Sequence, residues 1–161
     1  MKKILKKEVL RKKLEELRKK GKKIAFTNGC FDILHVGHVR YLREARKTAD
    51  LLVLALNSDS SVRSIKGEKR PLINEKERAE ILAALESVDY VTIFKESTPL
   101  KLIKFLKPDI LIKGGDWPEE KVVGREEVKK WGGHVEIIPE IKGKSTTNIV
   151  DKIKQIYCFD K

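Results

Sequence analysis

The 161-residue chain has little cysteine, and its two cysteines are not paired in the sequence. Cys30 and Cys158 lie far apart and form no CxxC motif, so neither a disulfide framework nor a cysteine zinc site is expected. We expect Cys30 to be a small buried residue, with an oxidation-sensitive thiol as the alternative.

Long apolar runs and several catalytic motifs are missing as well. No segment approaches the ~20 apolar residues that span a bilayer, and the Lys-rich N-terminus lacks the apolar core of a signal peptide. We therefore expect a cytoplasmic protein without a membrane partner. The chain also lacks a GxxxxGK phosphate loop, a GxGxxG turn after its first strand and a GxSxG nucleophile elbow. These absences disfavour P-loop kinases, dinucleotide-dependent dehydrogenases and α/β-hydrolases.

Positive charge is abundant but concentrated at one end. The formal net charge is +12, and residues 1–23, with 12 Lys or Arg and 3 Glu, carry +9 of it. Leu10, Leu14 and Leu17 recur at helical spacing, which predicts a basic helix over residues 1–22 that packs on the core and is solvated on its charged face. Binding of nucleic acid or an anionic membrane by this face is the alternative. We expect no nucleic-acid partner.

The remaining residues, 23–161, alternate between apolar strand patterns and helical patterns, as expected for one domain. Such alternation predicts an α/β fold with a doubly wound, mostly parallel five-stranded sheet. The expected strands are 24–26, 51–56, 88–94, 109–112 and 134–138. The expected helices are 39–45, 75–86, 99–107, 119–131 and 147–157.

Polar and glycine-rich segments follow four of the expected strands. In a doubly wound sheet, ligands bind at the carboxyl ends of the strands, so these segments should meet at one cleft. They comprise residues 27–38 after the first strand, 57–71 after the second, 113–117 after the fourth and 143–147 after the fifth.

A pair of histidines marks the turn after the first strand. His35 and His38 flank Gly37 at the start of a helix, where free backbone amides and the helix dipole favour an anion. Two imidazoles can donate hydrogen bonds to phosphoryl oxygens there, and Gly37 permits close approach of the ligand. One packed and one solvated helix-start histidine is the alternative. A zinc site at these histidines is less well supported, because Asp32 alone does not complete the ligand set.

Each of the other segments also has two readings. Lys66 and Arg70 are candidate cations for a leaving pyrophosphate, or part of a solvated loop. The run Ser145, Thr146 and Thr147 can bind phosphate, cap the last helix, or do both. The segment Gly114–Trp117 can border a ligand, or form a plain turn in which Asp116 caps a helix and Trp117 fills a groove.

These motifs resemble a known superfamily. The run from Thr27 to His38 is similar to the HxGH signature of nucleotidyltransferases, and 145–147 resembles their second phosphate-binding motif. The runs 57–59, 66–71, 84–89, 113–116 and 145–149 extend the likeness to the adenylyltransferase domain of bacterial ADP-heptose synthases, from about residue 10 onward. The sugar kinase domain of bifunctional members is not part of this sequence, so we expect cooperation with a separate heptose kinase.

The resemblance implies a Rossmann-like nucleotidyltransferase that moves AMP from ATP to D-glycero-β-D-manno-heptose 1-phosphate, giving ADP-heptose and pyrophosphate for the lipopolysaccharide core. Mg²⁺, held mainly by the ATP phosphates, is the implied cofactor, and a homodimer is the implied assembly. No metal-ligating residue is expected. The catalytic set would be His35, His38, Lys66 and Arg70. The nucleotide-binding set would be Thr27, Asn28, Gly29, Phe31, Asp32, Gly37, Arg78, Lys113, Gly114, Gly115, Asp116, Ser145, Thr146 and Thr147, where Asp32 either orders the turn or faces the acceptor.

One departure from the related pattern leaves alternatives open. Glycerol-3-phosphate cytidylyltransferases carry an Arg in the second motif, whereas Glu140, Lys142 and Lys144 precede Ser145 here. This weakens the prediction of a cytidylyl reaction on glycerol 3-phosphate or another small phosphorylated acceptor, which is the first alternative. A non-catalytic nucleotide-binding or nucleic-acid-binding module is the second.

Overall fold

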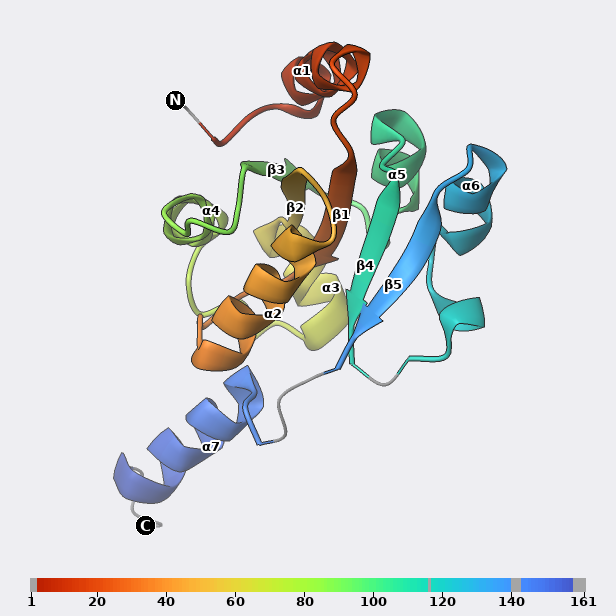
Figure 1. Cartoon of the computed structure of the whole chain (residues 1–161). Helices are drawn as coiled ribbons and strands as arrows, with labels where there is room; N and C mark the ends of the chain where they lie inside the picture. Colours follow the sequence, from red (N-terminus) through yellow and green to blue (C-terminus); the bar gives the residue numbers. More distant parts are fainter. Residues whose placement is uncertain (1–2, 116, 140–142, 158–161) are drawn as a thin grey trace.

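Five parallel strands form the centre of the protein. The computed structural model describes residues 3–115, 117–139 and 143–157. Its sheet has the order β3-β2-β1-β4-β5 with every neighbouring pair parallel (Figure 1). The strands are β1 (Ile24–Gly29), β2 (Leu51–Asn57), β3 (Tyr90–Phe94), β4 (Ile110–Gly114) and β5 (His134–Ile138). The predicted five-stranded, doubly wound sheet is confirmed, and the strand order changes direction between β1 and β4, where such folds bind ligands.

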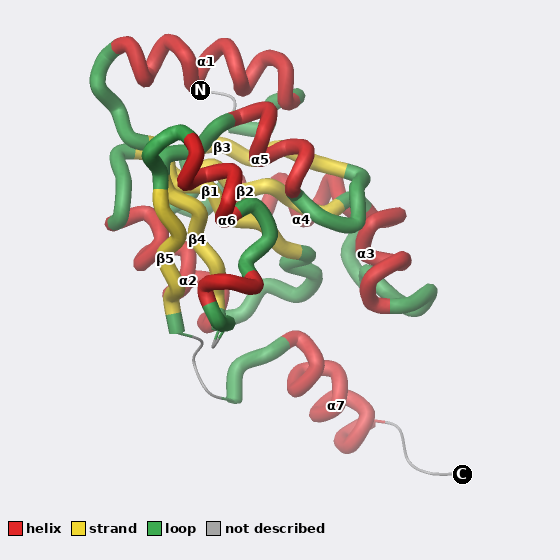
Figure 2. The backbone as a smooth tube through the Cα atoms, turned by 90° about the vertical axis from the view of Figure 1, so that its right-hand side faces the viewer, coloured by secondary structure: helices red, strands yellow, loops and turns green. Residues whose placement is uncertain are grey.

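Helices cover both faces of this sheet (Figure 2). They are α1 (Lys7–Lys19), α2 (Val36–Lys47), α3 (Asp59–Lys66), α4 (Glu75–Ala83), α5 (Leu100–Leu106), α6 (Arg125–Lys130) and α7 (Thr146–Tyr157), with a 3-10 turn η1 (Glu119–Lys121). Side chains of α1, α5 and α6 join one core cluster, and side chains of α2 and α4 join the cluster on the opposite face. No helix in the described ranges is long and apolar enough to cross a membrane.

The apolar run of β2 explains why the sheet is buried on both sides. Val53 and Ala55 point into one core, whereas Leu52, Leu54 and Leu56 point into the other, and all five are fully buried. Because successive side chains of a strand alternate between faces, a continuous apolar run fits only a central strand with helices on both sides.

The N-terminal helix α1 packs on the face opposite α2. Leu10 and Leu14 are fully buried in the core cluster that α5 shares. The Nη2 atom of Arg18 donates to the carbonyl oxygens of Leu106 and Lys107 at 2.6 Å each, at the carboxyl end of α5. Cations stabilise that end of a helix because its carbonyl groups are unpaired.

Two helical predictions are wrong in detail. Residues 59–66 are not among the expected helices, but they form α3, which Ser58 caps by accepting a hydrogen bond from the Ser61 amide at 3.2 Å. The expected helix 119–131 is divided into η1 and α6, because Gly124 has a φ of +95°. Positive φ interrupts a right-handed helix, and glycine adopts it at low cost.

Candidate active site

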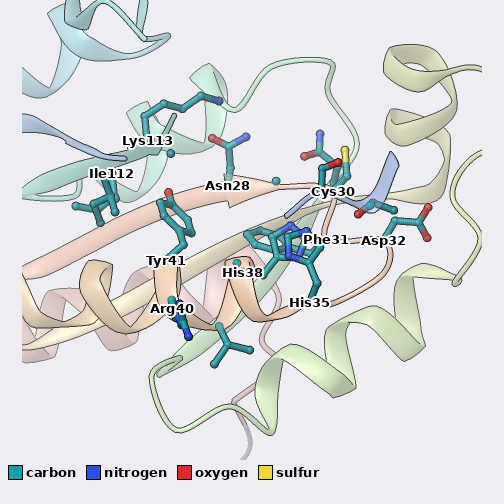
Figure 3. Close-up of a pocket in the computed structure, with 18 of the residues that line it drawn as sticks. Asn28, Cys30, Phe31, Asp32, His35, His38, Arg40, Tyr41, Ile112 and Lys113 are labelled. Carbon is teal, nitrogen blue, oxygen red and sulfur yellow. The ribbon is translucent and has the colours of Figure 1, made fainter. Parts of the chain in front are cut away.

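The two imidazoles of the HxGH run lie against each other at the start of α2. His35 occupies the N-cap position of α2, and His38 lies in its first turn. Their ring centroids are 3.8 Å apart in a stacked arrangement, and the Phe31 ring is tilted against His38 at 5.0 Å. Figure 3 shows the two rings beside Phe31, with Tyr41 and Lys113 on one side and Asp32 on the other. Both histidines line the same large cavity.

Gly37 makes room for this arrangement. A Cβ atom at Gly37 would lie 2.9 Å from Cε1 and Nδ1 of His35 and 3.3 Å from the Cβ atom of Lys144. A side chain at this position would therefore displace the His35 ring. The glycine also brings Lys144, next to α7, close to the start of α2.

Burial determines the charge of His38. Desolvation, with a smaller contribution from neighbouring His35, lowers the pKa of His38 from 6.5 to about 4. The ring is therefore neutral at pH 7, when one nitrogen donates and the other accepts a hydrogen bond. Its Nδ1 atom is buried and has no hydrogen-bond partner in the described part of the chain.

Two helix N-termini face the cavity. No side chain caps α2, so the amides of its first turn are available for an anion. At the start of α7, Ser145 Oγ accepts from the Asn148 amide at 3.1 Å, and Thr146 Oγ1 donates to the Ile33 carbonyl at 3.4 Å. The second bond joins α7 to the loop between β1 and α2. Ser145 thus caps α7 and also lines the cavity, so the two readings of this motif are compatible.

Cations lie on two sides of the histidine pair. Lys66, at the end of α3, and Arg70 line the cavity beyond β2, and Lys113 and Lys144 line it beyond β4 and β5. The Asp32 carboxylate pairs with Arg70, with 2.7 Å between Oδ2 and Nε. Cationic groups on both sides of these hydrogen-bond donors can neutralise a phosphate chain along its length.

Most of the predicted site residues line this one cavity. Those that do are Asn28, Gly29, Phe31, Asp32, His35, Gly37, His38, Lys66, Arg70, Lys113, Gly114, Ser145, Thr146 and Thr147. Trp117 also lines it and is half exposed, with Lys113 Nζ 5.5 Å from its ring centroid. Gly115 is described but is absent from the lining, and Asp116 lies outside the described residues.

Thr27 supports the cavity floor and does not line it. It is fully buried, and its Oγ1 is 2.6 Å from the Tyr41 hydroxyl. The Tyr41 ring packs on Gly114, where a Cβ would approach Cε2 to 3.1 Å. The predicted nucleotide contact of Thr27 is therefore replaced by an indirect one: it fixes Tyr41, which lines the cavity itself.

Arg78 also differs from its prediction as a nucleotide contact. Its side chain is fully buried and is absent from the cavity lining. The guanidinium donates to the carbonyl oxygens of Ile73, Cys30 and Asn57 and pairs with Asp59 at 2.7 Å. These partners consume most of its donors, so Arg78 holds the loops behind the cavity.

Sequence reasoning missed several lining residues. Tyr41 was assigned only to a helix, and Ser97 and Thr98 after β3 were not considered. A usable signal was present, because Ser97 and Thr98 follow an apolar strand as the other predicted segments do. The expectation that segments after the strands meet at one cleft covers the first, second, fourth and fifth strands and leaves out the residues after the third.

Comparison with known proteins agrees with this geometry. The family model described as cytidylyltransferase-like matches residues 26–154. The chain belongs to the cytidylyltransferase-like family of nucleotidyltransferases. The resemblance to the HxGH superfamily is thereby confirmed, and the matched range includes every predicted site residue.

Relatives of this cytidylyltransferase-like chain include much longer proteins. It is 59% identical to the bifunctional protein HldE of Pelobacter propionicus over 96% of this chain and 32% of that protein. It is 60% identical to the HldE of Geobacter metallireducens over 89% of this chain and 29% of that protein. The chain thus spans about a third of the length of these curated relatives.

Solved structures support the same fold. A lipopolysaccharide core biosynthesis protein from Thermoplasma volcanium aligns with a TM-score of 0.64 and 32% identity, over 77% of this chain and 100% of that one. A pantoate-beta-alanine ligase from Francisella tularensis aligns with a TM-score of 0.57 over 98% of this chain and 79% of that one. Its 17% identity supports the shared fold alone.

The protein itself offers no ready metal cage within the described residues. No group of three or more His, Cys, Asp or Glu side chains there could hold a metal ion. Cytidylyltransferase-like enzymes use a nucleoside triphosphate, generally with a divalent metal, and such an ion can be carried by the phosphates.

Proposed function

We propose that this chain transfers AMP from MgATP to D-glycero-β-D-manno-heptose 1-phosphate, giving ADP-heptose and pyrophosphate. The observation that carries the choice of acceptor is the 59% identity to HldE across 96% of the chain. The Thermoplasma neighbour, described as a lipopolysaccharide core biosynthesis protein, favours the same class of product. The cavity favours the reaction type, because cations and helix N-termini surround its histidine pair.

The proposed reaction is a direct in-line displacement. An oxygen of the sugar phosphate attacks the α-phosphorus of ATP, a new P–O bond forms, and the bond to the bridging oxygen of pyrophosphate breaks. The attacking phosphate is already anionic, so no general base is needed. The enzyme contributes positioning and charge stabilisation.

Roles follow from where the side chains lie. His35 and His38 would donate to phosphoryl oxygens around the α-phosphate. The backbone amides at the N-termini of α2 and α7 would bind the other phosphates of ATP. Lys66 and Arg70 would hold the acceptor phosphate or the leaving pyrophosphate. Lys113 and Gly114 at the end of β4 would border the ribose and base.

Further parts of the proposal concern the setting of the enzyme. We propose Mg²⁺ as the ion that accompanies ATP, consistent with its preference for oxygen ligands and retained waters. We also propose a homodimer in the cytoplasm, supplied with its acceptor by a separate heptose kinase. The bifunctional relatives suggest this supply, because their name denotes a second activity.

A pyrophosphate-release screen tests the proposal. ATP, CTP, GTP and UTP are each combined with heptose 1-phosphate, glycerol 3-phosphate, ethanolamine phosphate and a buffer blank. We expect release to be fastest with ATP and heptose 1-phosphate and to require Mg²⁺. Preference for CTP with glycerol 3-phosphate would replace the proposal with the cytidylyltransferase alternative, and no release in any well would favour a binding module.

A further inference from the structure

Asp32 borders the cavity, but its carboxylate is buried against the protein. Its residue is only 3% exposed. One carboxylate oxygen, Oδ1, accepts from the amides of Leu72 and Ile73 at 2.8 and 2.9 Å, and Oδ2 lies 2.7 Å from Nε of Arg70. Asp32 therefore directs both oxygens at the segment 70–73.

The ion pair with Asp32 leaves the two Nη groups of Arg70 available to a ligand. The arginine Nε lies 2.7 Å from Oδ2 of Asp32 in an ion pair that lacks hydrogen-bond geometry, and neither Nη forms a hydrogen bond within the described ranges. The side chain is 23% exposed and lines the cavity. A planar guanidinium held at one edge presents its remaining N–H groups in a fixed direction, which suits bidentate binding of a phosphate.

Arg78 holds the same segment from behind. Its Nε donates to the Ile73 carbonyl at 2.8 Å, while its Nη atoms reach the Asn57 carbonyl and Asp59 at 3.0 and 2.7 Å. Ile73 is thus fixed at its amide by Asp32 and at its carbonyl by Arg78. Residues 67–74 lie between α3 and α4 and contain no helix or strand, so these side chains supply the restraint that a regular element would otherwise give.

We infer that Asp32 and Arg78 are positioning residues that orient Arg70 toward the phosphates, and that Asp32 contacts neither substrate. The inference rests on the proposed function for the identity of those phosphates. It differs from the reading in which Asp32 faces the acceptor. A misplaced reacting or binding group costs on the order of 10²-fold in rate, so the orientation of Arg70 matters for turnover even though Asp32 lies behind it.

A double-mutant cycle tests this inference. The variants are Asp32→Asn, Arg70→Gln and the double variant, with kcat/KM for AMP transfer and the dissociation constant for inorganic pyrophosphate as readouts. Asparagine keeps the Oδ1 acceptor for Leu72 and Ile73 but turns an amide N–H toward Arg70 Nε. In each single variant we expect kcat/KM to fall, and the dissociation constant for pyrophosphate to rise, by about tenfold or more. The double variant should match Arg70→Gln within about twofold in both quantities, since coupled residues are non-additive.

Asp89→Asn is the matched control. Asp89 also pairs with an arginine Nε, that of Arg46 at 2.8 Å, and accepts a backbone hydrogen bond from Leu52. It lies at the amino end of β3 and is absent from the cavity lining, and Arg46 borders the cavity only from the last turn of α2, at the opposite end of that helix from the histidine pair. Its loss should lower stability as much as Asp32→Asn does while leaving both readouts within about twofold of wild type. Equal losses from the two variants would overturn the inference, because the effect would then be general destabilisation.

A second variant covers the case in which Asp32→Asn does not fold. Arg70→Lys keeps the charge, but an ammonium paired with Asp32 has no second edge to present. We expect it to bind pyrophosphate nearly as weakly as Arg70→Gln does, and wild-type binding would overturn the inference. Additive losses in the cycle would also overturn it. If wild type transfers no AMP but its pyrophosphate binding shows the coupling, the proposed function fails and the inference stands.

Discussion

His38 is the residue on which we expect turnover to depend most strongly. Its ring lines the cavity at the first turn of α2, where a donor can meet the charge that develops on the α-phosphate. Removing one such donor costs on the order of 10² to 10³ in rate. His38→Ala should lose about this factor in kcat, measured by pyrophosphate release, and should keep its fold by circular dichroism.

His134→Ala serves as the control for that variant. His134 is exposed at the amino end of β5, so its loss should leave kcat unchanged. Near-normal turnover of His38→Ala would contradict the assignment of the histidine pair.

The low pKa of His38 also makes stability depend on pH. Its pKa is about 4 in the folded protein, against the ordinary histidine value of 6.5, because burial disfavours the charged ring. The unfolded chain therefore binds this proton more tightly, and the free energy of unfolding should fall as the pH decreases from about 6.5 to about 4. Denaturant titrations across this range should show a shallower decline for His38→Asn, and equal slopes would refute the prediction.

Arg78 makes its main contribution to stability. Replacing it with Met leaves three backbone carbonyls without their donor and Asp59 without its ion pair. Breaking a buried pair from one side costs about 3–5 kcal/mol. We expect the free energy of unfolding of Arg78→Met to fall by this amount in guanidinium titrations. A loss below 1 kcal/mol would contradict the network described for Arg78.

At the scale of elements, apolar patterning predicted the sheet better than it predicted the helices. Continuous runs such as 51–56 can satisfy burial only as central strands, so all five strands were located. The segment 59–66 is mostly polar, and its helix depends on capping by Ser58. The spacing of apolar residues therefore does not predict this helix. The break at Gly124 depends on its positive φ, and a side chain there would also meet Ile103, which lies 2.7 Å from where a Cβ would be.

The candidate site shows the same division. The histidine pair and the strand-end cations could be predicted, because strand ends in a parallel sheet converge. The indirect roles of Thr27 and Arg78 could not, because each depends on partners far away in the sequence, Tyr41 and the carbonyls of separate loops. The division of the chain into a basic helix 1–22 and a domain 23–161 stays a prediction.

The helix α7 should serve the ligand more than the fold. None of its described residues is buried, whereas Ser145–Thr147 line the cavity. Truncation after Lys144 should therefore change Tm by less than about 4 °C, since little packing is lost. ATP binding should weaken at least tenfold, equivalent to about 1.4 kcal/mol, as measured by calorimetry.

Ile153→Ser with Ile156→Ser is the matched control for the truncation. Both side chains are about half exposed on α7 and absent from the cavity lining, so ATP affinity should be retained. Unchanged ATP affinity in the truncated protein would exclude a role for α7 in nucleotide binding.

At the scale of the whole molecule, charge is divided between two regions with different roles. The basic helix α1 lies beside α5 and the amino ends of the strands (Figure 1). The cavity includes the residues at the carboxyl ends of β1, β2 and β4. Charges more than about 10 Å apart are largely screened at 0.1 M salt. Most of the net charge of +12 should therefore have little influence on the bound phosphates.

The quadruple variant Lys12→Gln, Lys13→Gln, Lys19→Gln, Lys20→Gln tests this separation. It removes three positive charges from α1 and a fourth at its C-cap, yet kcat/KM for AMP transfer at 0.1 M salt should stay within about twofold of wild type. Lys66→Gln removes a single charge inside the cavity and should cost tenfold or more, because a cation next to a desolvated phosphate is weakly screened. If the quadruple variant lost activity while Lys66→Gln kept it, the basic helix would be part of the working surface. Salt-dependent binding of generic DNA that disappears in the quadruple variant would then favour the nucleic-acid alternative.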